Sequence, residues 1–151
     1  RWSLAGLVKE VGEAYAAGVR AVVFFPKIEE DLKTPEGEEC FNPDGLVPRA
    51  IQAVKEAYPD MVVITDVALD PYNSDGHDGI VVEGDDGELK ILNDETVEVL
   101  CRQALCHADA GADIVSPEKE SLLGGISALR LSCNTNLYFE GEPSGPLSLP
   151  E

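Results

Sequence analysis

The sequence has 151 residues, of which 44% are hydrophobic and 26% charged, and its formal net charge is −18 at pH 7. That composition is typical of a soluble globular protein, and the length suffices for one domain with a sizeable core. A charge this negative argues against nucleic acid and against an anionic membrane surface as partners, because both are bound through basic patches. It favours cations where carboxylates converge.

Neither a membrane anchor nor a secretion signal is predicted. No apolar run approaches the roughly 20 residues that a membrane-spanning helix needs. The chain begins with Arg1 and has no charged and apolar signal-peptide pattern, so we expect a processed or incomplete start.

The four cysteines lack CxxC pairs and zinc-finger spacing, which favours thiols in a reducing compartment. They are Cys40, Cys101, Cys106 and Cys133.

Residues 4–25 predict a helix followed by a strand. Apolar residues recur at the spacing of one buried helix face, at Leu4, Leu7, Val8, Val11 and Tyr15. Gly18 stands where glycine often ends a helix. Residues 20–25 are a continuous apolar run closed by Pro26, and we expect both faces of this strand to be covered. Residues 27–45 are polar and contain Pro and Gly, which predicts a long loop.

A second helix and strand cover residues 47–65. The helix has apolar residues at the same kind of spacing, at Val47, Ala50, Ile51, Val54 and Tyr58. It ends before Pro59. Residues 61–65 form the second apolar strand, which runs into Asp66 and an acidic loop.

The third unit contains the clearest helix of the sequence. Asn93 is its predicted N-cap, and residues 94 and 95 are acidic, which the helix dipole favours in a first turn. One apolar stripe runs along the helix, through Val97, Leu100, Cys101, Ala104, Leu105 and Ala108. Gly111 ends it, and residues 112–115 form a third strand.

Strands that alternate with helices predict parallel βαβ units and an α/β fold. A TIM (β/α)8 barrel needs about 250 residues, so this chain supplies about three of eight units, a partial barrel that cannot close alone. We therefore expect residues 1–117 to be the N-terminal part of an α/β barrel. Residues 118–132 diverge and have a weak helix pattern, whereas residues 133–151 are turn-rich and expected to be disordered.

The segment from Asp66 to Gly79 is the candidate site. It leaves the C-terminal end of a buried strand, where α/β barrels place their active sites. It reads DVALDPYNSDGHDG, with four aspartates and His77 and no basic residue. Crowded carboxylates repel one another unless a cation or protons lie between them, and oxygen ligands favour Mg²⁺ or Ca²⁺ over zinc. On composition alone, an ordinary turn explains these residues equally well.

This segment resembles the metal-loop signature of porphobilinogen synthase, also called 5-aminolevulinate dehydratase. The resemblance covers about residues 1–117 and includes five further motifs: FP at 25–26, NPDGLVP at 42–48, NDET at 93–96, AGAD at 110–113 and VSP at 115–117. It implies a lyase that condenses two 5-aminolevulinates into porphobilinogen, the pyrrole unit of haem and chlorophyll.

The family has two versions of this loop, one with three cysteines that depends on zinc and one with an Ala-Asp-Asp pattern. Ala68, Asp70 and Asp78 match the aspartate version, which implies Mg²⁺ as the cofactor and His77 as a further member of the metal loop. By the same resemblance, Asp66 is an active-site carboxylate. Direct ligation by Asp70 and Asp78 stays open, because aspartate-rich members often hold their magnesium elsewhere.

Two lysines form Schiff bases with the substrate in this family, and both lie on later strands than the resemblance reaches. Lys27 and Lys119 follow strands here, but at positions that the family does not use for this chemistry. The other four are interpreted as solvated charges: Lys9, Lys33, Lys55 and Lys90. We therefore expect no dehydratase activity from this chain alone.

Beyond Pro117 the family pattern SPSDMMDGRV is replaced by SPEKESLLGG, a break typical of a splice, frame or gene-model change.

His107 lies beside Cys106 in the third helix. Because consecutive helix residues diverge by about 100°, the two do not form a metal pair, and His107 is interpreted as a surface residue.

Two other functions stay open. One is a non-catalytic protein that changes the assembly of full-length subunits through an open sheet edge. The other is a divalent-cation module with no link to the pathway. The resemblance itself implies 5-aminolevulinate as the substrate, a homo-octamer as the full-length assembly, and a location in the plastid stroma for a plant or alga and in the cytoplasm otherwise.

Overall fold

The computed structural model describes residues 1–84 and 87–117, so the expectations for residues 118–132 and 133–151 lie outside its described part. A three-stranded sheet forms the body, with strand order β1-β2-β5 and both pairs parallel. Its strands are Ala21–Phe24 (β1), Val62–Val67 (β2) and Ile114–Pro117 (β5). The α/β class with parallel strands is confirmed, and no closed barrel is formed by the described residues.

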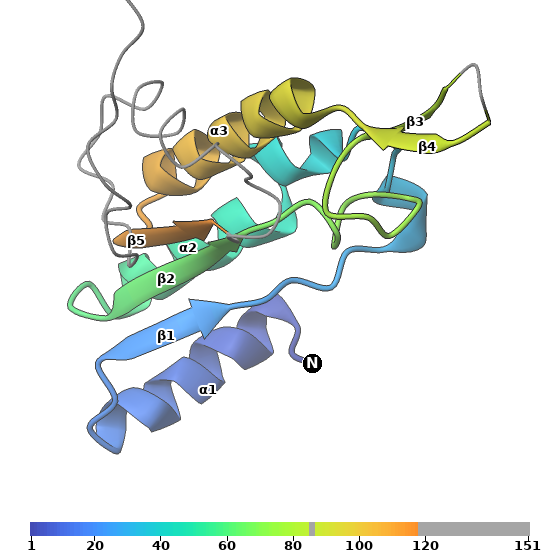
Figure 1. Cartoon of the computed structure of the whole chain (residues 1–151). Coiled ribbons are helices and arrows are strands. Elements are labelled where there is room, and N and C mark those ends of the chain that lie inside the picture. The colour runs from blue at the N-terminus through green and yellow to red at the C-terminus, as the bar shows by residue number, and fades with distance from the viewer. Residues whose placement is uncertain (85–86, 118–151) are drawn as a thin grey trace, which may run out of the picture.

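Three α-helices accompany the sheet (Figure 1). They are Leu4–Ala16 (α1), Leu46–Ala57 (α2) and Asn93–Asp109 (α3), close to the predicted ranges. Helices α2 and α3 are the crossovers that a parallel order of strands requires. No helix in the described ranges is long and apolar enough to cross a membrane.

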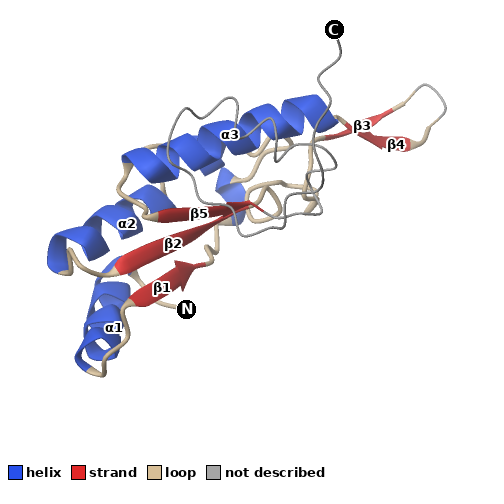
Figure 2. Cartoon of the chain, turned by 60° about the vertical axis from the view of Figure 1, so that its left-hand side comes forward, coloured by secondary structure: helices blue, strands red, loops and turns tan. Residues whose placement is uncertain are grey.

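The three helices cover one face of the sheet, as Figures 1 and 2 show from two directions. Phe24 and Val63 pack with α1 and α2 in one apolar cluster. Val67 and Val115 pack with α3 in a second cluster. Because strand side chains alternate between faces, these four residues mark the helix-facing side, and their neighbours in each strand point the other way.

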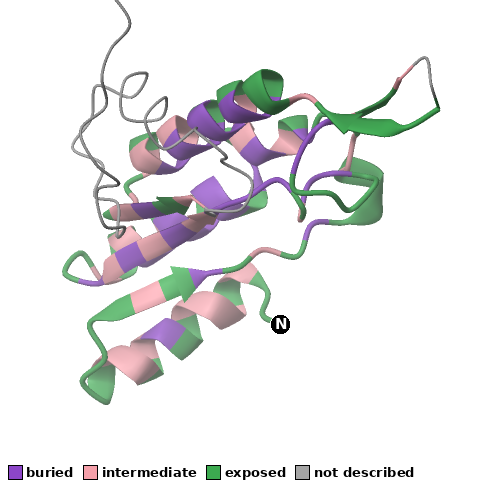
Figure 3. Ribbon diagram, viewed as in Figure 1, coloured by how far each residue is buried: buried purple, intermediate pink, exposed green. Residues whose placement is uncertain are grey.

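The other face of the sheet is open at β1, so the expectation that both faces of this strand are covered is wrong. Val23 is 48% exposed and Phe25, just past the strand, is 76% exposed. Figure 3 shows the strand exposed or half-buried up to its last residue. The continuous apolar run is typical of a strand covered on both sides, but the described helices all lie on one side.

The ends of the helices follow from local hydrogen bonds. The Ser3 hydroxyl of the α1 N-cap accepts a bond from Gly6 N at 3.2 Å. Helix α3 ends at Asp109, and Gly111, just past the cap residue Ala110, has a φ of 105°, the left-handed conformation that suits glycine. Asn93 is not the cap of α3 as predicted: the cap position is Leu92, and Asn93 is the first helical residue.

A β-hairpin that the sequence did not predict follows the acidic loop. Its strands, Val81–Glu83 (β3) and Leu89–Ile91 (β4), pair antiparallel. Figure 1 shows it projecting from the body beside the start of α3. The predicted loop at residues 27–45 also contains two short 3-10 helices, Glu30–Leu32 (η1) and Glu38–Phe41 (η2).

Candidate functional site

The acidic loop leaves the C-terminal end of β2, on the edge of the sheet where α/β folds place their sites. Asp66 is the residue before the last in β2 and is paired in register with Ser116 of β5. Its neighbours Thr65 and Val67 are buried on the helix-facing side. The half-buried Asp66 side chain therefore belongs to the opposite face, which is the interior face of a barrel.

The loop is anchored by buried residues and exposes its acids. Leu69, Tyr72 and Asn73 are at most 2% exposed. The backbone N–H groups of Tyr72 and Asn73 both donate to Leu69 O at 2.9 Å, which closes one tight turn. The acidic and histidine side chains of the loop beyond Asp66 are all exposed: Asp70, Asp75, His77 and Asp78. The sequence therefore places its apolar residues inward and its carboxylates at the rim.

Asn73 organises the second half of this loop. Its Oδ1 atom accepts hydrogen bonds from Asp75 N at 2.7 Å and, more weakly, from His77 N at 3.4 Å. Its Nδ2 atom donates to Pro35 O at 2.7 Å. A buried amide costs stability unless it is hydrogen-bonded, and here both ends of the side chain have partners. Asn73 thus fixes the backbone that carries Asp75, His77 and Asp78.

The loop between β1 and α2 packs directly against the acidic loop. Thr34 N donates to Tyr72 O at 3.2 Å, and Ser74 N donates to Thr34 O at 3.0 Å. Gly37 has a φ of 65°, and a Cβ added there would lie 2.5 Å from Leu69 Cδ1. This position therefore needs glycine for its backbone conformation and for the close approach of the two loops.

Two of the predicted metal residues interact electrostatically. Partial burial raises the pKa of the Asp70 carboxyl, and the negative charge of Asp78 raises that pKa further. A lysine from the neighbouring loop, Lys33, has an opposing effect. Asp70 and Asp78 are thus close enough to repel each other, which is the situation that a proton or a cation relieves.

The donor set suits a hydrated Mg²⁺ better than a metal cage. Among the described residues, no group of three or more His, Cys, Asp or Glu side chains is arranged to hold a metal ion. Mg²⁺ commonly binds through one or two carboxylates and keeps several waters, and Asp70 with Asp78 meets that need. Ala68 is buried and offers no ligand atom. The role predicted for His77 stays a prediction.

The far end of the loop is tied to α3. Ile80 N donates to the Thr96 hydroxyl at 3.0 Å, and that hydroxyl donates to Leu92 O at 2.6 Å. The backbone bond from Leu92 N to Ile80 O, at 2.8 Å, closes the same junction. A buried threonine in the first turn of α3 therefore holds the point at which the acidic loop passes into the hairpin.

His107 is buried beneath the sheet, so its assignment to the helix surface is wrong. It is fully buried, and its Nδ1 atom lies 3.0 Å from the Thr65 hydroxyl. Burial lowers the pKa of His107 to about 4, so the ring is neutral near pH 7. Thr65 precedes Asp66 on β2 and faces the other way. His107 thus supports the strand behind the candidate site without reaching it.

Two of the four lysines predicted to be solvated charges, Lys33 and Lys55, are partly buried instead. The Lys33 side chain is 19% exposed and that of Lys55 is 24% exposed. Lys55 Nζ donates to Pro59 O and Met61 O, both at 3.0 Å, and pairs with Asp113. Lys9, by contrast, is 80% exposed as predicted. Lys119 lies outside the described residues.

The cysteines provide no metal or redox centre in the described part of the chain. Cys40, Cys101 and Cys106 form no disulfide. Burial raises the pKa of the Cys40 thiol to about 12, so this thiol stays protonated and is a poor metal ligand. Cys133 lies outside the described residues.

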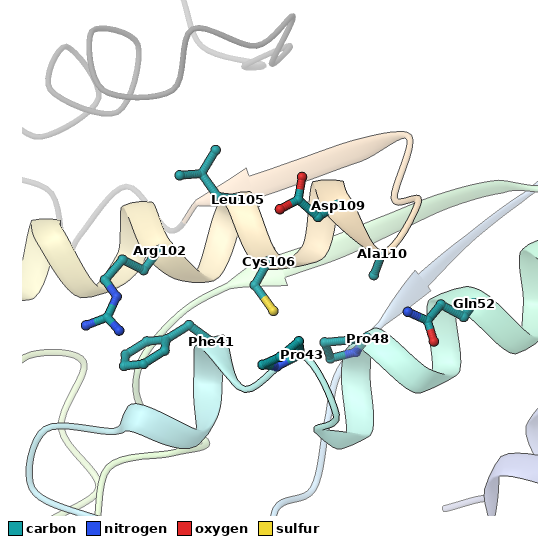
Figure 4. A pocket seen from close by; sticks show the side chains of 9 residues that line it. All are labelled: Phe41, Pro43, Pro48, Gln52, Arg102, Leu105, Cys106, Asp109 and Ala110. Atoms are coloured by element: carbon teal, nitrogen blue, oxygen red, sulfur yellow. The ribbon is translucent and has the colours of Figure 1, made fainter.

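A separate hollow of about 510 Å³ lies on the helix side, between η2, α2 and α3. Figure 4 shows Arg102 over the Phe41 ring at one end and Asp109 near the other, with Cys106 between them. The Arg102 guanidinium carbon lies 3.5 Å from the ring centroid, a cation–π contact. This hollow lies on helix surfaces, away from the C-terminal strand ends that carry the candidate site.

The parallel units, the one-sided helix cover and the acidic loop at the C-terminal strand edge define a segment of an α/β barrel. The sequence model of the family "Delta-aminolevulinic acid dehydratase" matches residues 1–139. The chain belongs to this family. The match also runs past Pro117, where the resemblance was expected to stop.

Individual relatives agree with this assignment. The chloroplastic delta-aminolevulinic acid dehydratases of Selaginella martensii and Glycine max are 54% and 58% identical over 134 and 125 residues. These alignments cover 89% and 83% of this chain. A crystal structure of the Toxoplasma gondii enzyme (porphobilinogen synthase) with its product porphobilinogen has a TM-score of 0.82 and 52% identity over 89% of this chain.

The chain spans less than two fifths of the length of each of these three proteins. It covers 31% of the Selaginella sequence, 29% of the soybean sequence and 37% of the Toxoplasma chain. The family and the partial-barrel fold are therefore shown for this segment.

Proposed function

We propose that this chain is part of a porphobilinogen synthase subunit, the lyase that condenses two 5-aminolevulinates into porphobilinogen for tetrapyrrole synthesis. One observation carries the proposal: the Asp66–Gly79 loop sits at the C-terminal edge of the sheet in a chain 54–58% identical to plant dehydratases. The product named with the Toxoplasma structure supports the same reaction.

The residues of the loop divide into two proposed roles. Asp66, on the interior face at the end of β2, is the carboxylate placed to orient an ammonium group of the substrate and accept a proton from it. Asp70 and Asp78 are the pair for a hydrated Mg²⁺, with His77 on the same turn. When bound, Mg²⁺ would supply positive charge that favours both carboxylates in their ionised form.

The assembly and location follow from the family as further proposals. The full-length partner is a homo-octamer of dehydratase subunits, and the substrate is 5-aminolevulinate. The Selaginella and Glycine relatives are named chloroplastic, which supports the plastid stroma for a plant or algal source. There, porphobilinogen would supply chlorophyll as well as haem.

The reaction is tested with a chimera. Residues 1–117 replace the matching segment of the soybean enzyme, and porphobilinogen is measured with a colour reagent for pyrroles. We expect the chimera to form porphobilinogen and its Asp66→Asn variant to lose activity by about 100-fold or more. Asp60→Asn, at an exposed turn before β2, is the control and should match the parent chimera.

The chain of 151 residues is tested in the same assay. We expect no porphobilinogen, because the Schiff-base lysines of the family are expected on later strands. Activity of the chain alone would overturn that expectation. An inactive but folded chimera would count against the proposed function itself.

A non-catalytic role in subunit assembly is the second candidate. The open apolar face at Val23 and Phe25 favours it, since such surfaces mark contacts with other chains. Co-purification of the tagged chain with full-length dehydratase would support this role. A monodisperse chain that does not bind the enzyme would contradict it.

A further inference from the structure

Helix α3 buries two polar side chains, and one atom of each lacks a partner. His107 is fully buried and Gln103 is 1% exposed. His107 Nε2 and Gln103 Oε1 have no hydrogen-bond partner among the described residues. Burying a polar atom without a partner costs stability. Because residues four apart lie on the same face of a helix, these two side chains are neighbours.

The other imidazole nitrogen shows where the proton of His107 lies. Nδ1 is 3.0 Å from the Thr65 hydroxyl, which has no other hydrogen-bond partner among the described residues. A hydroxyl has one proton to donate, and Nδ1 is the acceptor within its reach. Because burial lowers the pKa of His107 to about 4, the ring is neutral near pH 7 and carries one proton. With Nδ1 as the acceptor, that proton lies on Nε2.

The two unpartnered atoms are therefore complementary. Nε2–H is a donor and Oε1 is an acceptor, yet they form no bond with each other. A cation would meet the N–H group and an anion would meet the amide oxygen, so an ion of either sign is disfavoured. A neutral molecule that accepts one hydrogen bond and donates another suits both atoms. Water is the smallest such molecule, and a buried water usually has about two to four polar partners.

The rest of this buried face is apolar. Leu100 and Ala104 lie on the same side of α3 and are fully buried. They belong to one cluster with strand residues Val67 and Val115. Such side chains offer no hydrogen bond, so a molecule in this place would be held by the two polar residues of α3.

We propose that His107 and Gln103 form an internal binding site for one water molecule, which accepts a hydrogen bond from His107 Nε2–H and donates one to Gln103 Oε1. The bonds then run in one direction, from the Thr65 hydroxyl through the imidazole and the water to the amide. They tie α3 to the strand that carries Asp66. The site needs neither substrate nor metal, so it goes beyond the proposed function and holds whether or not the soybean chimera is active.

The proton and the water are tested by NMR of the isotope-labelled chain at pH 7. The sequence has two histidines, and His77, which is exposed in the acidic loop, is the internal control. We expect the ring nitrogens of His107 to show a protonated Nε2 and an unprotonated Nδ1, and the Nε2–H proton to show a nuclear Overhauser contact with bound water. The His77 ring should show no such contact. A proton on Nδ1, or an Nε2–H signal without a water contact, would overturn the proposal.

Gln103→Met tests the other end of the site. Methionine is similar in length but is at most a weak acceptor, so the water loses one of its two bonds. We expect exchange of the His107 Nε2–H proton with solvent to accelerate by about tenfold. Gln52→Met, the same change at an exposed position of α2, is the matched control and should leave this exchange unchanged. Equal exchange in the parent and in Gln103→Met would overturn the role of Gln103.

A double-mutant cycle measures the coupling of the two residues. The variants are Gln103→Met, His107→Leu and both together, followed by urea unfolding at pH 7. Each single change leaves the other polar atom without its bridge, and we expect the equilibrium constant of unfolding to rise about tenfold. The double variant should rise by clearly less than the product of the two, because neither atom remains unpaired.

A double variant equal to that product would overturn the proposal, as would an equal coupling of His107→Leu with Gln52→Met. The NMR outcomes rest on the parent chain and on Gln103→Met, so they decide the proposal even if His107→Leu does not fold.

Discussion

His107 supports the candidate site from behind. It fills the space between α3 and β2 and meets Thr65 there, one residue before Asp66. Its Nε2 atom and the Oε1 atom of Gln103, one turn away, are buried and have no hydrogen-bond partner among the described residues. Buried polar atoms of this kind usually bond to ordered water. The strand end that carries Asp66 is therefore backed by buried polar side chains as well as by apolar packing.

Protonation of His107 should destabilise the protein. Burial lowers its pKa from 6.5 to about 4, so the unfolded chain binds this proton at a higher pH than the folded chain does. The contribution of His107 is therefore fully present above pH 6.5 and is lost as the pH falls towards 4. At about 1.4 kcal/mol per pKa unit, the loss reaches about 3 kcal/mol.

The measurement is urea unfolding between pH 4 and 7.5 for the parent and for His107→Gln. The carboxylates of the chain titrate in both proteins, so the difference between the two curves isolates the histidine. We expect the parent to lose more stability than the variant below pH 6.5. Parallel curves would show that His107 is protonated equally in both states.

At single residues, the sequence predicted the acids of the loop but not what surrounds them. The burial of His107 had a signal, since it lies three residues after Ala104 and seven after Leu100, on the same apolar face. The partial burial of Lys33 had none, since the next residue, Thr34, is bonded to Tyr72 and Ser74 of a loop far along the chain. Local patterns do not report such contacts.

At the scale of elements, a polar clamp joins α2 to two strands. Lys55 near the end of α2 pairs with Asp113 at 3.0 Å, and Asp113 also accepts a bond from Val63 N at 2.8 Å. The clamp lies at the N-terminal ends of the strands, opposite the acidic loop. In α/β barrels that end contributes stability rather than catalysis.

Asp113→Ala should therefore lower stability without affecting the site. It removes the acceptor of Val63 N and the ion-pair partner of Lys55, which keeps its bonds to Pro59 O and Met61 O. We expect a loss of about 1–3 kcal/mol in the free energy of unfolding. Urea unfolding at pH 7 measures it. Asp60→Ala, at an exposed turn, is the matched control and should change stability by less than about 0.5 kcal/mol. In the soybean chimera, Asp113→Ala should still form porphobilinogen.

The main elements were predictable because their apolar spacing is regular. Helices α2 and α3 each carry a repeating buried face, α1 carries a half-buried face around the buried Val11, and β2 is a short apolar run between turn residues. The hairpin was not predictable, because β3 and β4 have three residues each and are mostly exposed. Strands that bury little leave little hydrophobic pattern to detect.

At the scale of the whole molecule, the sheet has one covered face and one open face. Val23 and Phe25 are exposed on the open side, and β1 has a second edge that is unpaired within the described residues. Exposed apolar strands at a sheet edge tend to pair with other chains. We therefore expect this segment to associate with itself or with other dehydratase chains when it is produced in isolation.

Val23→Lys should reduce that association. A charge on the open face of an edge strand opposes pairing with another chain, whereas the helix-facing core is left intact. Sedimentation velocity over a range of concentrations measures the change. Val82→Lys, which alters an exposed valine of the hairpin instead, is the control. Equal association of the parent and Val23→Lys would place the contact elsewhere on the molecule.

The clamp at Asp113 also bears on the order in which the chain assembles as it is made. Its bond to Val63 joins residues 50 apart, so β2 reaches its final form only after β5 has left the ribosome. At about 5–20 residues per second, that interval is roughly 2–10 seconds. During it, the edge of β2 is open to other nascent chains, and this is the stage at which a chaperone would act on the protein.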